Sequence, residues 1–323
     1  MTSPVSYERV DPALRPLLDA APAIALSTDA LATIRSQRRL PIPSADAQGA
    51  AVEQSVRAIA GGAGAPEVQV IVYRPPDLTE PAPCVLHFHG GGFVMGSAAA
   101  MEGPHRTVSA RLRCVIVTVE YRLAPETVFP GALEDAYAAL GWVMAHADEL
   151  GIDPARVGVS GESAGGGLAA ALALVARDRG EHALAFQHLI YPMLDDRTCT
   201  AVEPHPHTGA FIWTPHNNRF GWTALLGAEP GGPDVSPYAA PARAIDLSGL
   251  PPAYISTGGL DLFLEEDLDY ARRLMRSGVP VELHVYPGAF HAFELSPDAA
   301  VAEQSRRDSL AALQRLTAPP PPR

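Results

Sequence analysis

The sequence predicts an α/β fold in which helices flank a mostly parallel central sheet and an accessory layer covers part of it. From about residue 67, short β-branched runs alternate with longer alanine-rich runs, which is typical of parallel sheets covered by helices. Hydrophobic residues make up 47% of the 323 residues and charged residues 19%, a balance that allows a sizeable core. Two segments, 1–50 and 198–249, fall outside the alternation and account for the accessory layer.

The alternating part of the chain supplies the elements of this fold. Short apolar runs are predicted as strands at 68–73, 84–88, 115–119, 157–160, 188–191, 253–256 and 281–286. Longer runs are predicted as helices at 132–146, 164–177, 265–276 and 299–316. Because the strands are expected to run mostly parallel, loops that follow them should meet at one edge of the sheet.

The interruptions also predict the domain organisation. Residues 1–50 are expected to form N-terminal cap helices, and residues 198–249, which are rich in Pro, His, Trp and Gly, a cap insertion. The core is then made of two parts, 51–197 and 250–316. The ending TAPPPPR, 317–323, cannot form helix or strand ladders and is expected to be a flexible tail.

The charged residues exclude several classes of function. A net charge of −12 repels phosphate backbones and anionic lipid surfaces, so neither nucleic acid nor a membrane is expected as a partner. All 24 basic residues are arginine, which excludes Schiff-base catalysis, serine–lysine dyads and a phosphate-loop lysine. The N-terminus lacks a basic and apolar signal pattern, and no stretch of about 18 apolar residues occurs, so we expect a soluble, cytoplasmic protein. Cys84, Cys114 and Cys199 lack metal-site spacing and are expected to be free thiols.

A candidate nucleophile lies between a predicted strand and a predicted helix. The run Gly161, Glu162, Ser163, Ala164, Gly165 follows the apolar RVGVS and precedes the helical GGGLAAALALVA. A serine on such a tight turn projects from the sheet, and its small neighbours are needed because the strained backbone leaves little space. The amides of the following helix point toward a developing oxyanion. This context predicts that Ser163 is a nucleophile.

A serine hydroxyl needs a base, and the chain order expected for this turn is serine, acid, histidine. Only His284 and His291 follow a suitable acid, Asp261. His284 lies inside a predicted strand, whereas His291 lies in a loop just past that strand. We therefore predict His291 as the general base and Asp261, in the loop after the strand 253–256, as the acid that orients it.

The other acids near Asp261 are expected to be solvated. Glu265, Glu266, Asp267 and Asp269 follow at the predicted start of a helix, where negative charge complements the helix dipole. Only Asp261 occupies the loop itself, so it alone is assigned a role in catalysis.

A glycine run after an earlier strand predicts an oxyanion hole. Three consecutive glycines follow His89, namely Gly90, Gly91 and Gly92, and allow a backbone path on which amides converge on one oxygen. The expected donors are the amides of Gly91 and Gly92 together with that of Ala164, the residue after the nucleophile. A phosphate loop is the alternative, but the chain has no lysine to support it.

Several motifs together resemble the bacterial hormone-sensitive-lipase-like esterases, the family IV carboxylesterases. They are HGGG at 89–92, YRLAPE at 121–126 with FP at 129–130, GESAGG at 161–166, and YPG at 286–288 leading to His291. The resemblance runs from about residue 80 to the end. It implies an α/β-hydrolase fold with a helical cap, no cofactor, no metal, and a serine carboxylesterase acting on small, short-chain esters. A homodimer is suggested only by family analogy.

The same resemblance assigns supporting roles near the site. His89, Gly90, Gly161 and Gly165 belong to the matched motifs, and the acids Glu126 and Glu162 are supporting rather than reactive. The family usually has Asp-Pro-Leu where this chain has Asp261, Leu262 and Phe263, which slightly weakens the assignment of the acid. Arg122 is expected to pair with an acid that the sequence does not name. His205, His207 and His216 could be metal ligands, but they lack further ligands at suitable spacing.

The cap insertion is rich in aromatic residues, which predict an apolar acyl pocket. Phe211 and Trp213 are the candidates for its lining, with Phe220 and Trp222 nearby; the alternative is that these rings only attach the cap to the sheet. Two other functions stay open. One is a hydrolase of amides, lactones or carbonates with the same residues. The other is a non-catalytic ligand receptor, since plant gibberellin receptors resemble this family, although His291 argues against it.

Overall fold

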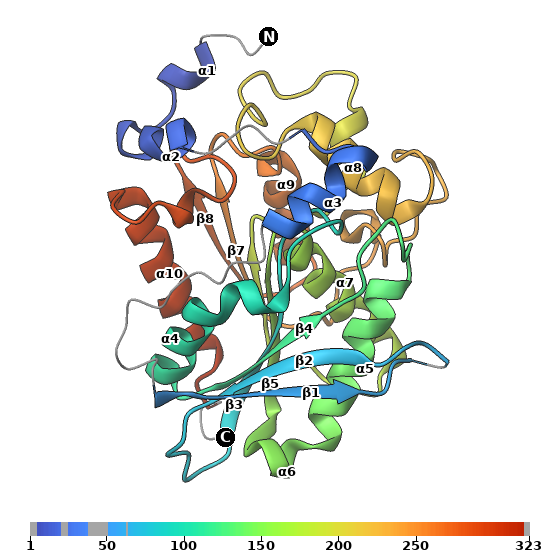
Figure 1. Cartoon of the computed structure of the whole chain (residues 1–323), viewed down its shortest axis with the longest axis vertical. Helices are drawn as coiled ribbons and strands as arrows, with labels where there is room; N and C mark the ends of the chain where they lie inside the picture. Colours follow the sequence, from blue (N-terminus) through green and yellow to red (C-terminus); the bar gives the residue numbers. More distant parts are fainter. Residues whose placement is uncertain (1–4, 21–24, 38–50, 63, 320–323) are drawn as a thin grey trace.

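One eight-stranded sheet organises the computed structural model, which describes residues 5–20, 25–37, 51–62 and 64–319 (Figure 1). The strands are β1 (Glu53–Ile59), β2 (Val68–Arg74), β3 (Ala82–Phe88), β4 (Val115–Glu120), β5 (Ile152–Glu162), β6 (Gln187–Ile190), β7 (Ala253–Gly258) and β8 (Val281–Tyr286). Their order in the sheet is β1-β2-β4-β3-β5-β6-β7-β8. β2 pairs antiparallel with β1 and β4, and all other pairs are parallel. The predicted α/β fold class is confirmed.

The seven predicted strands are present, but β1 was not predicted. It lies at the edge of the sheet, and of its seven residues only Ile59 is buried. A strand exposed on both faces has no reason to alternate apolar and polar residues, so its sequence EQSVRAI carries no strand pattern.

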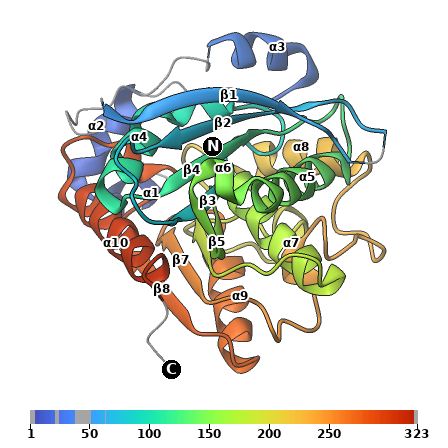
Figure 2. The same ribbon diagram turned by 90° about the horizontal axis from the view of Figure 1, so that it is seen from below.

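Helices cover both faces of the sheet. The core helices are α4 (Glu102–Leu112), α5 (Gly131–Ala145), α6 (Ala147–Leu150), α7 (Ala164–Arg179), α9 (Leu264–Arg276) and α10 (Ala300–Leu316). Figure 2 shows α4 and α10 on one face, and α5, α7 and α9 on the other. In α7 every residue from Ala164 to Ala176 is buried, so its glycines and alanines allow close packing against the strands. None of the described helices is long and apolar enough to cross a membrane.

The predicted cap segments 1–50 and 198–249 contact each other where the structure describes them. The N-terminal part contains α1 (Val5–Glu8), α2 (Arg15–Ala20) and α3 (Thr28–Gln37), and the later segment contains α8 (Pro215–Leu226). Just before α3, the amide of Leu26 donates to Asn217 Oδ1 at 2.9 Å, and His216 Nε2 lies 3.0 Å from the carbonyl of Leu26. The chain just before α3 and the start of α8 therefore lie close together. The division into cap and core stays a prediction, and 1–4, 21–24 and 38–50 of the predicted cap lie outside the described residues.

The predicted tail is wrong at its first residue. Thr317 is buried, its hydroxyl donates to the carbonyl of Leu313, and its own carbonyl accepts a hydrogen bond from Arg156 Nη2 at 2.8 Å. Arg156 lies in β5, so the end of α10 is attached to that strand. Residues 320–323 lie outside the described residues. The three cysteines are free, as predicted.

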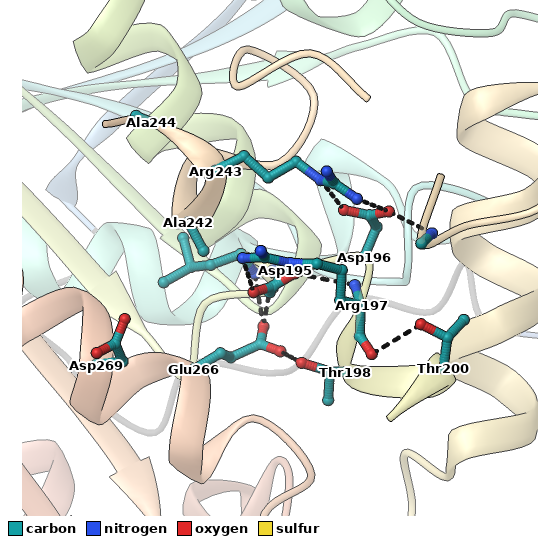
Figure 3. A network of polar contacts seen from close by, with 12 residues as sticks. Asp195, Asp196, Arg197, Thr198, Thr200, Ala242, Arg243, Ala244, Glu266 and Asp269 are labelled. Carbon is teal, nitrogen blue, oxygen red and sulfur yellow. Dashed lines mark hydrogen bonds and ion pairs between the residues drawn. The ribbon is translucent and has the colours of Figure 1, made fainter. Parts of the chain in front are cut away.

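The expectation that the acidic start of α9 is solvated is wrong for two of its residues. Glu266 and Asp267 are buried on the inner side of α9, and Glu266 faces the segment after β6. Glu266 accepts hydrogen bonds from the amides of Leu194, at 2.7 Å, and Asp195, and from the Thr198 hydroxyl (Figure 3). A carboxyl that satisfies buried backbone donors does not need solvent.

An acid in the segment after β6, Asp196, forms a buried ion pair. Asp196 is fully buried and accepts hydrogen bonds from Arg243 Nε at 2.6 Å and Nη2 at 2.9 Å, as well as from the amide of Gly231 (Figure 3). Arg243 ends the 3-10 helix Pro241–Arg243, so the pair joins the segment after β6 to the chain before β7.

We predict that Arg243→Met lowers the free energy of unfolding by about 3 to 5 kcal/mol, because it leaves the Asp196 carboxylate buried without its counterion. Urea denaturation followed by circular dichroism measures this loss. Arg272→Met is the matched control, because Arg272 and its partner Asp269 are 59% and 51% exposed and such a pair contributes less than about 1 kcal/mol. Equal losses in the two variants would contradict the prediction.

Candidate active site

Ser163 lies on a strained turn between β5 and α7. Its backbone has a φ of 56° and a ψ of −120°, which residues with a side chain rarely adopt. Gly161 and Gly165 are required beside it: a Cβ on Gly165 would lie 2.0 Å from the carbonyl oxygen of Phe88, and one on Gly161 would lie 2.4 Å from Gly165. The turn is therefore packed directly on the end of β3, with no room for side chains.

Three loops bring Ser163, His291 and Asp261 together. Ser163 follows β5, Asp261 follows β7 and His291 follows β8. His291 Nε2 lies 2.9 Å from Ser163 Oγ, and His291 Nδ1 lies 2.9 Å from Asp261 Oδ2. The other oxygen of Asp261 accepts from the amide of Phe263 at 3.0 Å. Only 5% of Ser163, 5% of His291 and 1% of Asp261 is exposed.

This arrangement can activate a hydroxyl. With Nδ1–H of His291 directed at the carboxylate of Asp261, Nε2 is left to accept the proton of Ser163. The alternative base, His284, lies in β8, where its Nε2 is 2.8 Å from Glu282 Oε1 and its Nδ1 faces Asp308. The geometry thus favours His291 over His284.

The glycine loop after β3 lies beside Ser163. A Cβ on Gly90 would lie 3.4 Å from Cβ of Ser163. Gly91 and Gly92 have φ values of 126° and 61°, and the carbonyl of Gly91 accepts from two amides that follow it, so the loop turns sharply. No described residue accepts a hydrogen bond from the amides of Gly91 and Gly92, and Ala164 is the first residue of α7, whose amide has no partner within the helix. These three amides therefore have no acceptor among the described residues.

His89 supports this loop without taking part in proton transfer. Its ring stacks on Tyr121 at 4.3 Å, its Nδ1 lies 2.8 Å from the carbonyl of Gly90, and its own carbonyl accepts from the Tyr121 hydroxyl at 2.7 Å. Burial lowers the pKa of His89 to about 4, so the ring is neutral at pH 7.

Glu162 points away from the nucleophile and anchors the turn to β3. Its Oε2 accepts a hydrogen bond from His87 Nε2 at 2.9 Å, and His87 Nδ1 lies 3.0 Å from Thr118 Oγ1. Burial lowers the pKa of His87 to about 3 and raises that of Glu162 to about 7. The contact is therefore a hydrogen bond to a neutral imidazole rather than an ion pair.

Two residues beside His291 were missed by the sequence analysis. The ring of Tyr191, just after β6, lies 4.6 Å from the His291 ring, and its hydroxyl donates to Glu294 Oε1. Burial raises the pKa of Glu294 to about 7, with Glu162 contributing and the Tyr191 hydrogen bond and His291 opposing the rise. Two signals could have identified the pair: Tyr191 follows a strand at the site edge, and Glu294 comes three residues after His291.

The two predicted pocket residues have different surroundings. A Cβ on Gly92 would lie 2.2 Å from Trp213 Cη2, and the Trp213 ring lies 6.2 Å from that of His291. Trp213 is nearly buried, and its Nε1 donates to Asn218 Oδ1 at 3.1 Å. Phe211 instead packs against Phe290 at 5.9 Å. Trp213 thus contacts the glycine loop after β3, called the oxyanion loop below, whereas Phe211 packs on the loop that carries His291.

The remaining predicted residues take structural positions. Arg122 pairs with the buried Asp135 at 2.7 Å, which is the acid the sequence could not name. The rings of His205 and His207 lie 5.9 Å apart, and His216 contacts the carbonyl of Leu26. In the part of the chain that the structure describes, no three His, Cys, Asp or Glu side chains are grouped as metal ligands would be.

We predict that Glu294→Gln becomes progressively more stable than the parent protein as the pH rises from 5 to 8. The pKa of Glu294 is raised in the folded state, so its contribution to stability is present at low pH and is lost as the pH rises through about 7. Glutamine stays neutral throughout. Denaturant unfolding at several pH values measures the difference in free energy. Glu303→Gln, at an exposed carboxylate on α10, is the control, and a difference for Glu294→Gln that stays constant with pH would contradict the prediction.

Comparison with known proteins agrees with this geometry. Residues 85–295 match the family described as the alpha/beta hydrolase fold. The chain is 36% identical to "Carboxylesterase NlhH" of Mycobacterium tuberculosis, over 98% of this chain and 99% of that protein, and 35% identical to "Esterase LipI" of the same species, over 88% of each. The solved structure "Bacterial Heroin Esterase" has a TM-score of 0.89 and 40% identity, covering 97% of this chain and 99% of that one. The chain belongs to the bacterial hormone-sensitive-lipase-like esterases of the alpha/beta hydrolase fold and is a carboxylic ester hydrolase.

Proposed function

We propose that this esterase hydrolyses small, short-chain carboxylic esters through an acyl-enzyme on Ser163, with His291 as general base and acid and Asp261 as the orienting acid. The observation that carries the proposal is the pair of 2.9 Å hydrogen bonds that join the three side chains. Each of the three follows the end of a different strand, β5, β7 or β8.

Acylation begins when His291 Nε2 accepts the proton of Ser163 while Oγ attacks the ester carbonyl carbon. The carbonyl oxygen becomes an oxyanion, which the amides of Gly91, Gly92 and Ala164 stabilise. Asp261 stabilises the imidazolium that has formed. His291 then donates its proton to the departing alcohol, which leaves the acyl group on Ser163.

Deacylation repeats these steps with water as the nucleophile. His291 accepts a proton from water, the hydroxide attacks the acyl carbon, and the same amides stabilise the second oxyanion. The proton returns to Ser163 Oγ as the carboxylic acid leaves. Each oxyanion donor accounts for about 10² to 10³ in kcat in comparable enzymes, so three amides supply a large share of the rate enhancement.

The proposed preference for short acyl groups rests on how little of the site is open. Ser163 and His291 are almost buried, and Trp213 lies on the oxyanion loop. We assign residues 1–50 and 198–249 as the cap, with Trp213 and Phe211 lining the acyl pocket. A cytoplasmic location and a homodimer belong to the same proposal and derive from the sequence and the family.

We predict that a series of p-nitrophenyl esters will be hydrolysed with kcat/KM highest for acetate and butyrate and much lower for laurate. The reason is that a long acyl chain has to displace residues of the proposed cap, which cover the site. Matched p-nitroanilides should react far more slowly, because the amine is a poorer leaving group. A rate that rises with chain length, or faster turnover of the anilides, would contradict the proposed substrate class.

The same preparation tests the nucleophile. An organophosphate should block turnover and label Ser163, because only an activated hydroxyl reacts quickly with such a reagent. Ser163→Ala is the control that should lose both label and turnover. A label on another serine would contradict the assignment.

Asp261→Asn should lower kcat by about 10⁴-fold, because the amide no longer holds the His291 tautomer that presents Nε2 to Ser163. Glu265→Gln is the matched control, since Glu265 is an exposed acid four residues away on α9. Steady-state kinetics on the preferred ester, with circular dichroism to verify folding, measures both. Comparable losses in the two variants would show that Asp261 has no special role.

A further inference from the structure

Arg35 on α3 contacts the oxyanion loop at Val94. Its Nε donates to the carbonyl of Val94 at 2.7 Å, and its Nη2 donates to the carbonyl of Ala124 at 2.7 Å. Its two Nη groups also form a bidentate pair with Glu126, at 2.7 and 2.9 Å. One guanidinium from the N-terminal segment thus holds two separate loops of the core.

The first of these loops carries the proposed oxyanion donors. Val94 comes two residues after Gly92, and its amide donates to the carbonyl of Gly91 at 3.1 Å. The second loop is joined to the first by the amide of Ala124, which donates to the carbonyl of Phe93 at 2.9 Å. Movement of Val94 would therefore pass directly to Gly91 and Gly92, the glycines whose amides are the proposed oxyanion donors.

Within the part of the chain that the structure describes, Arg35 is the only donor to the two carbonyls it binds. Val94 and Ala124, which carry these carbonyls, are buried. A buried carbonyl left without a donor is unfavourable, so the loops would rearrange to satisfy it if Arg35 were removed. Lysine cannot replace the interaction, because its donors radiate from a single nitrogen rather than from a planar fork.

α3 and the chain just before it are held in place by burial of their apolar residues and by a contact with α8. Leu26 and Leu31 are buried, and Leu26 bonds to Asn217 of α8. α8 in turn contacts the oxyanion loop, since a Cβ on Gly221 would lie 2.8 Å from the carbonyl oxygen of Gly92. The orientation of Arg35 is therefore set by packing and not by its ion pair alone.

We propose that Arg35 is a positioning residue for the oxyanion hole, so that the N-terminal segment completes the active site rather than only covering it. The proposal rests on the roles proposed above for Gly91 and Gly92. It predicts that loss of Arg35 weakens stabilisation of the oxyanion more than binding of the ester.

The first test is Arg35→Ala on short-chain esters. We expect kcat to fall about 10- to 100-fold, less than for direct loss of a donor, with a much smaller change in KM. Millimolar guanidinium ion should restore part of kcat, because it can occupy the space left by the side chain. Arg219→Ala is the control: Arg219 on α8 forms an exposed pair with Glu229, and the variant should show neither loss nor rescue.

The second test separates an oxyanion effect from general damage. In a thionoester the carbonyl oxygen is replaced by sulfur, which accepts hydrogen bonds weakly and gains little from the oxyanion amides. The parent enzyme should strongly prefer the oxygen ester, and Arg35→Ala should reduce that preference. If the alanine variant does not fold, Arg35→Lys gives the same comparison, because it keeps the charge but not the fork.

Equal losses on ester and thionoester, or no response to guanidinium, would overturn the role of Arg35 while leaving the proposed function intact. Failure of the proposed function has a different signature: the parent enzyme would show no preference for the oxygen ester, and an organophosphate would not label Ser163. A reduced preference together with guanidinium rescue supports the proposal.

Discussion

The geometry of this site depends on one close approach of backbone to backbone, between Gly165 at the start of α7 and the end of β3. Because no side chain separates them, the turn that carries Ser163 and the glycine loop that leaves β3 share one edge of the sheet. The parallel register of β5, β6, β7 and β8 then delivers the loops with Asp261 and His291 to that edge. Ser163, Asp261, His291 and the glycine loop after β3 are thus brought to one edge of the sheet by strand pairing.

The elements that could be predicted from sequence are those whose burial or steric requirement is visible in their own local residue pattern. The runs that became β3, β4, β6 and β7 are buried on both faces and read as continuous apolar segments, while small residues around Ser163 reflect a local steric requirement. Ser163, Asp261 and His291 could be chosen because each lies in a loop that follows a predicted strand. The distances among the three side chains support the choice.

Other features depend on contacts between distant segments and leave no local pattern. Glu266 has the sequence context of a solvated helix start, yet it is buried because Leu194 and Asp195 present their amides to it. Glu294 is placed by Tyr191, about a hundred residues earlier in the chain, and Arg35 by the two loops it holds. In each case a polar side chain satisfies buried backbone or hydroxyl groups, and only the three-dimensional structure reveals its partners.

The hydrogen bond between Leu26 and Asn217 joins positions 191 residues apart. During synthesis on the ribosome, the N-terminal segment can therefore dock only after α8 has emerged, and the loop with His291 follows later still. Until α8 is made, the amide of Leu26 lacks its acceptor Asn217. The N-terminal segment thus reaches its final position only with chain that is synthesised much later, and the site is complete only when β8 and the loop with His291 have followed.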